Sequence, residues 1–433
     1  MDKFLVTGGT PLVGTIRVSG AKNSALPCMA AAILTEDEVV LDNIPHVRDI
    51  DTERRLLASM GGEVEIVDDG TNRTTRICCA VLSDPVAKYE IVKTMRASSL
   101  VLGPLVARTG LARVAMPGGC AIGGRPIDLH IKGLEKMGAV ITQEHGYLEA
   151  RAERLRGAHL VFDKITVTGT EDLLMAAVLA EGETLMENCA LEPEVVDLAT
   201  LLKEMGAKIE GAGTGTIRVQ GVTKLHGARH RIFPDRIEAG TFLIAGAITG
   251  GDLTVAGCNP RHLGAVMAKL QETGARVDIL RPDAVRVQME GALQAADIST
   301  EEYPGYPTDM QAQYMALATQ AEGVSMVKEN IFENRFMHVQ ELARMGANIK
   351  VDGRTATVRG KANLSATCVM CSDLRASASL VLAALVAEGQ SMLDRVYHMD
   401  RGYERIEEKL RGVGARIARV SHVPAGVGEE AFA

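Results

Sequence analysis

Aromatic residues are scarce in this sequence, and tryptophan is absent. Phe and Tyr contribute seven residues each, whereas 46% of the 433 residues are hydrophobic and 19 are Met. The core must therefore consist mainly of Ala, Val, Leu, Ile and Met side chains. A chain of this length exceeds the size at which a single hydrophobic core stops growing, so we expect two domains.

The signatures of several functional classes are also missing. No apolar run reaches the length of a membrane span, and residues 1–9, MDKFLVTGG, lack the apolar segment of a signal peptide. No Lys/Arg block stands out in a chain of net charge -8, which argues against a nucleic-acid partner. The sequence has no H-E-x-x-H motif, no P-loop and no G-x-G-x-x-G that opens a helix, so neither a metal nor a dinucleotide is expected.

The cysteine content gives no sign of a disulfide framework. Eight cysteines are scattered along the chain, and only Cys78 and Cys79 are adjacent. A chain of this size can be stable without disulfide bonds, so we expect reduced thiols in a cytoplasmic protein.

One short phrase, Leu-x-x-x-Gly-(Ala/Gly)-x-(Val/Ile), recurs six times. It reads LASMGGEV, LEKMGAVI, LKEMGAKI, LQETGARV, LARMGANI and LRGVGARI. Its glycines are separated by 77, 68, 68, 72 and 68 residues and are Gly61, Gly138, Gly206, Gly274, Gly346 and Gly414. Such regular spacing indicates an internal repeat. The phrase predicts an amphipathic helix that ends at a glycine of positive φ, followed by a strand.

Every copy also contains an Ala-rich stretch that is apolar on nearly every face after its first turn. These stretches are KNSALPCMAAAIL, MRASSLVLGPLVA, TEDLLMAAVLA, RIEAGTFLIAGAI, TDMQAQYMALAT and LRASASLVLAALVA. A helix that is apolar on all sides has to be buried. Each copy thus supplies one amphipathic helix, one buried helix and about four strands. The simplest arrangement places three buried helices inside a surround of sheets in each domain.

We place the domain boundary between the third and fourth copies, where the basic segment KLHGARHRIFPDR occupies residues 224–236. Residues 21–233 form the first domain. Residues 1–20 resemble the strand pair before the fourth copy and could complete either domain; we assign them, with residues 234–420, to the second. Residues 421–433 have little apolar periodicity and are expected to form a disordered tail.

The buried helices begin with polar residues, namely Lys22 and Asn23, Arg96, Arg236, Asp309 and Arg375. A cation at a helix N-terminus opposes the helix dipole unless an anion is also present there. The set therefore predicts a ligand rich in phosphate or carboxylate, although any single member could instead be solvated or paired with Asp or Glu.

The loop before each amphipathic helix supplies a second group of candidates. Counting back 13 residues from the repeat glycine reaches Arg48, Arg125, Arg261 and Arg401 in four of the six copies. Arg48 and Arg261 could be structural, whereas Arg125 and Arg401 lie in loops of more unusual composition. Of the other polar residues, Glu192 is either functional or a solvated loop acid, Asp309 either functional or a helix cap, and His130 is interpreted as structural.

The second copy departs most from the repeat, because its loop carries the insertion PGGCAIGGRP at residues 117–126. Four glycines surround Cys120, and Arg125 nearby would favour a reactive thiolate. The insertion is interpreted as a mobile loop that carries a functional thiol; the alternative is that Cys120 is a small buried apolar residue.

Several stretches resemble the UDP-N-acetylglucosamine 1-carboxyvinyltransferase family of enolpyruvyl transferases. They include SGAKNSALP, PGGCAIGGRPIDLHIKGLEKMGA, PDRIEAGTF, PTDMQAQ, FENRFMHVQELARMGA and DLRASASLVLA, and together they extend from residue 19 to about residue 415. The resemblance implies an α/β fold, the inside-out α/β barrel, with two domains that each contain three βαβαββ-type repeats and bury their helices inside. Thr168, in KITVTGTE, and Gly124 depart from the family's usual residues.

The family resemblance also implies a reaction and a set of site residues. Phosphoenolpyruvate would transfer its enolpyruvyl group to the 3′-hydroxyl of UDP-N-acetylglucosamine by addition and elimination, with no metal or organic cofactor. The implied catalytic residues are Cys120 as acid and covalent partner, Asp309 as the proton acceptor, Lys22 and Arg401. The implied substrate-binding residues are Lys22, Asn23, Arg96, Arg125, Pro126, Ile127, Asp128, Leu129, Lys164, Ile165, Thr166, Val167, Glu192, Asp309, Ile331, Arg375 and Arg401.

Two alternatives stay open at this point. A 3-phosphoshikimate 1-carboxyvinyltransferase would share the architecture but lacks the cysteine loop. A non-catalytic repeat protein that only clamps anionic partners would release no phosphate and would leave the Cys120 insertion unexplained.

Overall fold

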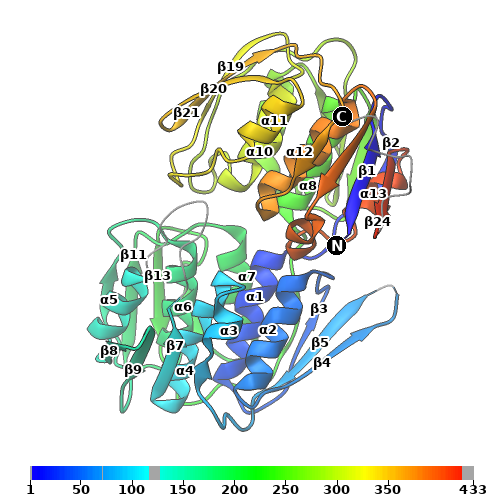
Figure 1. Ribbon diagram of the computed structural model, residues 1–433. Coiled ribbons are helices and arrows are strands. Elements are labelled where there is room, and N and C mark those ends of the chain that lie inside the picture. The colour runs from blue at the N-terminus through cyan, green and yellow to red at the C-terminus, as the bar shows by residue number, and fades with distance from the viewer. Residues whose placement is uncertain (1, 71, 117–126, 422–433) are drawn as a thin grey trace. The chain divides into compact units, whose positions relative to one another are not determined.

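The computed structural model describes residues 2–70, 72–116 and 127–421 (Figure 1). Its residues divide into two compact units. We call the described residues 20–70, 72–116 and 127–233 the first unit, and residues 2–19 together with 234–421 the second unit. No helix within these described ranges is both long and apolar enough to cross a membrane.

The first unit contains three four-stranded sheets with the strand orders β14-β3-β5-β4, β6-β7-β9-β8 and β10-β11-β13-β12. The strands are β3 Val39–Asp42, β4 Glu63–Asp68, β5 Arg73–Cys78, β6 Val86–Ala87, β7 Leu111–Ala115, β8 Val140–Glu144, β9 Tyr147–Arg151, β10 His159–Val161, β11 Glu183–Glu187, β12 Lys208–Glu210, β13 Thr216–Gln220 and β14 Arg229–Arg231. The helices are α1 Lys22–Ala31, η1 Ala32–Leu34, α2 Arg48–Ser59, α3 Tyr89–Val92, η2 Arg96–Val101, α4 Leu102–Thr109, α5 Asp128–Lys136, α6 Val167–Ala177 and α7 Pro193–Glu204.

The second unit repeats this plan with the strand orders β16-β17-β15-β2, β18-β19-β21-β20 and β22-β23-β1-β24. The strands are β1 Lys3–Thr7, β2 Val13–Arg17, β15 Asp252–Ala256, β16 Arg276–Arg281, β17 Ala284–Gln288, β18 Ile298–Ser299, β19 Gly323–Lys328, β20 Asn348–Asp352, β21 Thr355–Gly360, β22 Cys368–Met370, β23 Gln390–Asp394 and β24 Arg416–Val420. The helices are α8 Arg236–Ile248, η3 Pro260–Leu263, α9 Gly264–Glu272, η4 Thr308–Met310, α10 Gln311–Ala318, α11 Val339–Arg344, α12 Leu374–Val386, η5 Val396–Arg401 and α13 Ile406–Arg411.

Each sheet has one parallel pair of strands and two antiparallel pairs. In the sheet of β6, for example, β6 and β7 are parallel, whereas β7 pairs antiparallel with β9 and β9 antiparallel with β8. A parallel pair requires a crossover connection, and here η2 and α4 supply it. The resulting βαβαββ order is the one that the family resemblance implied, and it agrees with the helix and strand content predicted from the repeat.

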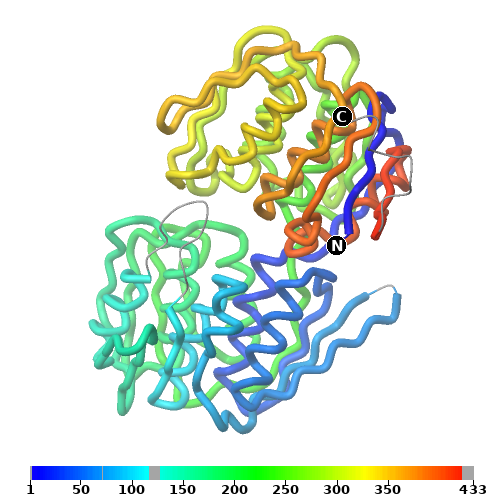
Figure 2. The backbone as a smooth tube through the Cα atoms, in the orientation of Figure 1, coloured from blue at the N-terminus to red at the C-terminus, as the bar shows by residue number. Residues whose placement is uncertain are grey.

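The start of the chain completes two sheets of the second unit. Strand β1 lies between β23 and β24 and is antiparallel to both, and β2 is parallel to β15. Figure 2 shows the blue start of the chain beside the red strand β24. Correspondingly, β14, which is parallel to β3, comes last in the first unit and closes its first sheet.

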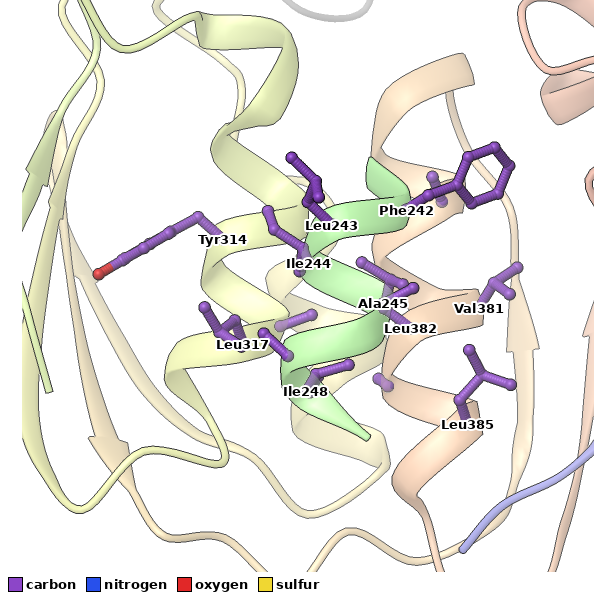
Figure 3. Packing of buried hydrophobic residues seen from close by; sticks show 14 of the residues in the cluster. Phe242, Leu243, Ile244, Ala245, Ile248, Tyr314, Leu317, Val381, Leu382 and Leu385 are labelled. Atoms are coloured by element: carbon purple, nitrogen blue, oxygen red, sulfur yellow. The ribbon is translucent and has the colours of Figure 1, made fainter. Parts of the chain in front are cut away.

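The buried helices form the centre of each unit. In the second unit, α10 packs against α8 and α12. Figure 3 shows Leu243, Ile244 and Ile248 of α8 near Leu317 of α10 and Leu382 of α12, and all of these side chains are buried. Burying one Leu, Ile or Phe side chain stabilises the fold by about 1.5–3 kcal/mol, so apolar helices of this kind favour the inside of the sheets.

The six repeat glycines have the backbone conformation that the sequence predicted. Their φ values are 105° at Gly61, 94° at Gly138, 102° at Gly206, 89° at Gly274, 100° at Gly346 and 103° at Gly414. In each copy an amphipathic helix ends a few residues earlier and a strand begins two residues later. Glycine allows this left-handed conformation without a steric penalty from Cβ, which explains why the repeat keeps it.

We expect Gly103→Ala to destabilise the first unit by about 1–3 kcal/mol, although alanine is normally the better helix former. Gly103 lies in α4, where an added Cβ would be 2.3 Å from the carbonyl oxygen of Asp172. Gly264→Ala, at the start of α9, is the matched control because its Cβ would meet no atom within 4 Å. Chemical denaturation of both variants checks this, and equal stabilities would contradict it.

Candidate active site

Lys22 opens helix α1 and already has a carboxylate partner. Its Nζ lies 3.2 Å from Oδ2 of Asp49, which lies on α2, and both residues are buried. The N-cap residue of α1, Ala21, offers no side-chain oxygen to the first turn of the helix. Asn23 follows Lys22 and is half-buried. The first turn of α1 therefore presents a lysine, an asparagine and backbone N–H groups without a capping side chain, a combination that suits an anion.

Glu53 lies one turn after Asp49 on α2 and is only 1% exposed. In the described part of the chain, neither of its carboxyl oxygens has a hydrogen-bond partner. Burial, and secondarily the charge of Asp49, raises the pKa of Glu53 to about 8. The carboxyl group is therefore mostly neutral at pH 7 and adds no second negative charge beside the Lys22–Asp49 pair.

Two further candidate segments begin helices α5 and α6. Ile127 is buried, Asp128 is exposed and Leu129 is half-buried at the start of α5. Lys164 is exposed, whereas Ile165, Thr166 and Val167 are half-buried at the start of α6. The hydroxyl of Thr166 caps α6 by accepting a hydrogen bond from Gly169 N at 3.2 Å.

A buried histidine joins the two helices that carry these segments. His130 of α5 has its Nδ1 3.0 Å from Oδ2 of Asp172 on α6, and its Nε2 is 3.3 Å from the hydroxyl of Thr168. Asp172 also accepts a hydrogen bond from Gly103 N at 2.7 Å, and burial raises the pKa of its carboxyl. His130 is thus structural, as the sequence indicated, and the atypical Thr168 has a partner for its hydroxyl.

A cavity of about 410 Å³ lies beside the same helices. Its lining consists of Gly133, the apolar residues Leu129, Leu160, Val161, Phe162 and Leu173, and the charged residues Lys132, Glu135, Lys136 and Asp163. Of the described residues that the family resemblance assigns to the nucleotide sugar, only Leu129 is among those that line this cavity. Of the remaining first-unit candidates, Arg96 is half-buried at the start of η2, and Glu192 is buried as the N-cap residue of α7.

In the second unit, Asp309 lies between two arginines. Nη2 of Arg335 is 2.7 Å from its Oδ1, and Nε of Arg375 is 3.3 Å from its Oδ2. The alternative that Asp309 is only a helix cap is wrong, because α10 has Met310 at its N-cap position and no side chain caps it. Arg375 is buried in the first turn of α12, and within the described residues its Nη1 and Nη2 make no hydrogen bond.

The other two second-unit candidates lie in connecting segments. Ile331 follows β19, and its backbone N–H donates to Oε1 of Glu329 at 2.9 Å. Arg401 is the last residue of η5, a helix that packs against α12. Its charge, after the larger effect of burial, lowers the pKa of the neighbouring His398.

The expected anion at the helix starts proves in two cases to be a carboxylate of the chain itself. Asp235 caps α8 through the N–H groups of Ile237 and Glu238, and Asp373 caps α12 through those of Arg375 and Ala376. For Arg236 and Arg375 the sequence-based argument from the helix dipole for a bound ligand anion is therefore not needed.

Some sequence-based candidates lie outside the described residues. These are Cys120, Arg125 and Pro126 of the insertion, together with the proposed tail after residue 421. Arg335, by contrast, is a contact of Asp309 that the sequence analysis missed. The only signal for it was its place in the stretch FENRFMHVQ, which matches the family as a whole.

The sequence analysis also overlooked a C-x-x-C pair, Cys368 and Cys371, at strand β22. Both are free thiols, as are the other cysteines that the structure describes. Burial raises the pKa of the Cys371 thiol to about 12, so this pair lacks the thiolate of a redox site. No group of three or more His, Cys, Asp or Glu that could hold a metal is found among the described residues.

Comparison of the whole chain with known families and solved structures defines its class. The family model of EPSP synthase (3-phosphoshikimate 1-carboxyvinyltransferase) matches residues 6–410. The enolpyruvyl transferase NikO from Streptomyces tendae is 25% identical, with a TM-score of 0.86 over 98% of this chain and 99% of NikO. EPSP synthase from Acinetobacter baumannii is 19% identical, with a TM-score of 0.72 over 98% of this chain and 100% of that one. Fold and family model thus define an enolpyruvyl transferase.

Curated relatives narrow the class to one family. A UDP-N-acetylglucosamine 1-carboxyvinyltransferase from Acidobacterium capsulatum is 77% identical over 423 residues, which cover 98% of this chain and 97% of the relative. One from Koribacter versatilis is 70% identical over 98% of both chains. The chain belongs to the UDP-N-acetylglucosamine 1-carboxyvinyltransferase family.

We expect Glu53→Gln to stabilise the protein by an amount that grows with pH. The folded chain holds this proton up to about pH 8, whereas an unfolded glutamate releases it near pH 4.5. Between these values the wild type loses free energy of unfolding as the pH rises, and the glutamine variant is spared this part of the loss. Denaturation midpoints at about pH 5, 7 and 9 measure the difference between the two proteins.

The exposed strand residue Glu63 provides the control, because Glu63→Gln should show no such trend. A Glu53→Gln stabilisation that stays constant across the pH series would contradict the assignment of a neutral buried carboxyl.

Proposed function

We propose that this protein transfers the enolpyruvyl group of phosphoenolpyruvate to the 3′-hydroxyl of UDP-N-acetylglucosamine and releases phosphate, the first committed step of peptidoglycan synthesis. The observation that carries the proposal is the 77% identity, over nearly the full length of both chains, to a UDP-N-acetylglucosamine 1-carboxyvinyltransferase. The insertion around Cys120 favours this acceptor over shikimate 3-phosphate, since the family resemblance associates that loop with the nucleotide-sugar enzymes. The free thiols of the described cysteines suit an enzyme of the cytoplasm.

Phosphoenolpyruvate carries a phosphate and a carboxylate, so its site needs several cations. We assign Lys22 and Asn23 at the first turn of α1 to this substrate, with Arg125 and Arg401 as further anion ligands. The Lys22–Asp49 distance of 3.2 Å supports this assignment, because the carboxylate fixes the position of an ammonium group that carries three N–H donors. Planar arginine groups bind phosphate and carboxylate through paired hydrogen bonds.

UDP-N-acetylglucosamine is assigned to the segments that begin α5 and α6, together with Arg96, Glu192 and Ile331. The assigned residues of the two segments are Arg125, Pro126, Ile127, Asp128 and Leu129, followed by Lys164, Ile165, Thr166 and Val167. The family resemblance supports this assignment, and Leu129 of the α5 segment also lines the cavity beside that helix. Arg375 is assigned to the reacting groups, because its buried Nη1 and Nη2 make no hydrogen bond to described residues and an anion would satisfy them.

The reaction needs an acid and a base. We assign Cys120 to protonate the methylene carbon of phosphoenolpyruvate and to form a covalent phospholactoyl adduct, and Asp309 to accept the proton of the sugar hydroxyl. Deprotonation of the hydroxyl makes it the nucleophile that adds to C2 of the substrate. Loss of phosphate from C2 of the resulting tetrahedral intermediate, together with loss of one proton from its methyl carbon C3, then restores the enol double bond.

We expect the wild type to release phosphate when UDP-N-acetylglucosamine and phosphoenolpyruvate are mixed, and not with shikimate 3-phosphate as acceptor. Cys120→Ser should lower kcat by about 10²–10⁴-fold, because a hydroxyl is a far weaker acid than a thiol. A continuous phosphate-release assay measures both effects. Full activity of Cys120→Ser would remove the acid role from Cys120, and activity with shikimate 3-phosphate alone would favour the alternative function.

A reactive thiol at position 120 should also be alkylated by the epoxide fosfomycin. Mass spectrometry of the intact protein and of its peptides should find one inhibitor per chain, attached to Cys120, since burial raises the pKa of other thiols such as Cys79 and Cys189 to about 12. Cys120→Ser is the matched control and should stay unmodified. An adduct on any other cysteine, or none, would count against the assignment.

A further inference from the structure

We propose that Arg335, Thr308 and Glu329 form a positioning chain that holds the carboxylate of Asp309 and the backbone at Ile331 in one fixed arrangement. All five residues belong to the second unit, and neither the sequence nor the family resemblance singled out the three members of the chain. The inference rests on the proposed function, because it takes Asp309 as the group that accepts the proton of the sugar hydroxyl.

The first link joins Arg335 to Asp309. Nη2 of Arg335 donates to Oδ1 of Asp309 at 2.7 Å, while Arg375 approaches the other carboxylate oxygen from α12. Arg335 is itself buried, with its guanidinium 5.1 Å from the ring centroid of Phe332. A carboxylate with a cation on each oxygen cannot rotate freely, so the direction of its remaining lone pairs is fixed.

The second link joins Arg335 to Thr308. Nη1 of Arg335 is 2.9 Å from the hydroxyl oxygen of Thr308, and that oxygen lies 3.0 Å and 2.9 Å from the two carboxylate oxygens of Glu329. Arginine can only donate, and a threonine hydroxyl has one proton. The directions are therefore determined: Arg335 donates to Thr308, and Thr308 donates to Glu329.

The third link joins Glu329 to the Ile331 segment. Glu329 is 1% exposed, and its Oε1 accepts hydrogen bonds from the N–H groups of Ile331 at 2.9 Å and Phe332 at 3.1 Å. The same oxygen accepts the hydroxyl of Thr300 at 3.0 Å. One buried carboxylate thus fixes the backbone of a segment assigned to the nucleotide sugar and, through Thr308 and Arg335, the orientation of the assigned base.

This arrangement gives the positioning chain a role that packing alone does not explain. Its two ends are the two second-unit groups assigned to the acceptor sugar, Asp309 and Ile331, and every link between them is a hydrogen bond to a charged group. A base that receives a proton from a bound hydroxyl has to keep its geometry to within a fraction of an ångström. We therefore assign Arg335, Thr308 and Glu329 as positioning residues for the proton acceptor.

Thr308 offers the sharpest test, because valine has nearly the same shape without the hydroxyl and serine keeps the hydroxyl. We expect Thr308→Val to lower kcat for phosphate release by about ten- to a hundredfold, the effect of losing hydrogen bonds to charged groups. The KM for phosphoenolpyruvate should change less than about twofold, since Thr308 is linked to Asp309 and Ile331, which are assigned to the acceptor sugar, and to no residue assigned to phosphoenolpyruvate. Thr308→Ser should retain most of the wild-type kcat.

A double-mutant cycle with Asp309→Asn shows whether Thr308 acts through Asp309. If it does, Thr308→Val should have little further effect, less than about twofold, once Asp309 is replaced. Equal fold-losses in the wild-type and Asp309→Asn backgrounds would overturn the inference, and so would a Thr308→Val enzyme with the wild-type kcat. Thermal denaturation of each variant shows whether it is folded. If Thr308→Val is not folded, Arg335→Lys replaces it in the cycle, because lysine keeps the positive charge but lacks the paired N–H donors of the guanidinium group.

The same assay separates this inference from the function on which it rests. A wild type that releases no phosphate from phosphoenolpyruvate and UDP-N-acetylglucosamine would refute the proposed function. An active wild type with an equally active Thr308→Val variant would refute only the positioning chain.

Discussion

The constraint on which the rest of the structure depends is the burial of helices that have no polar face. In α8 and α12 nearly every residue after the first turn is buried, and small residues such as Ala245 and Ala383 let these helices and their neighbours pack closely. Such helices are stable only inside a layer of sheets, so the amphipathic helices and strands have to form the outside of each unit. The first turns of the buried helices carry polar side chains and can therefore take part in substrate binding and catalysis. Lys22, Arg96 and Arg375 all lie in such first turns.

The sequence predicted this architecture well, because its physical causes are local and repeated six times. The left-handed glycine at each helix end has its own sequence phrase, and the all-round apolar pattern of the buried helices needs no knowledge of their partners. The sequence determined the strand pairing of residues 3–17 less well, since these residues resemble a strand pair that either unit could use. Pairing of β1 with β23 and β24 depends on contacts between residues almost 400 positions apart.

The site was predicted only in part, and the difference has a physical cause. A motif identifies a residue type at a place, as with Lys22 and Asp309, but it does not reveal what the side chain contacts. The pairing of Arg335 with Asp309 and the burial of Glu53 both arise from tertiary packing. A lone arginine or glutamate on an amphipathic stretch looks like an ordinary solvated residue in the sequence. His130 was the exception, since its apolar helical surroundings already indicated a buried structural role.

The central claim is that the first turns of α1, α5 and α6 hold the substrates. A crystal structure of the Asp309→Asn variant with phosphoenolpyruvate and UDP-N-acetylglucosamine bound tests it most directly. The account predicts the phosphate or carboxylate of phosphoenolpyruvate at Lys22 and Asn23 on α1, and the nucleotide sugar at the starts of α5 and α6. Substrates bound on the outer faces of the sheets, or anions bound away from these helix starts, would contradict it.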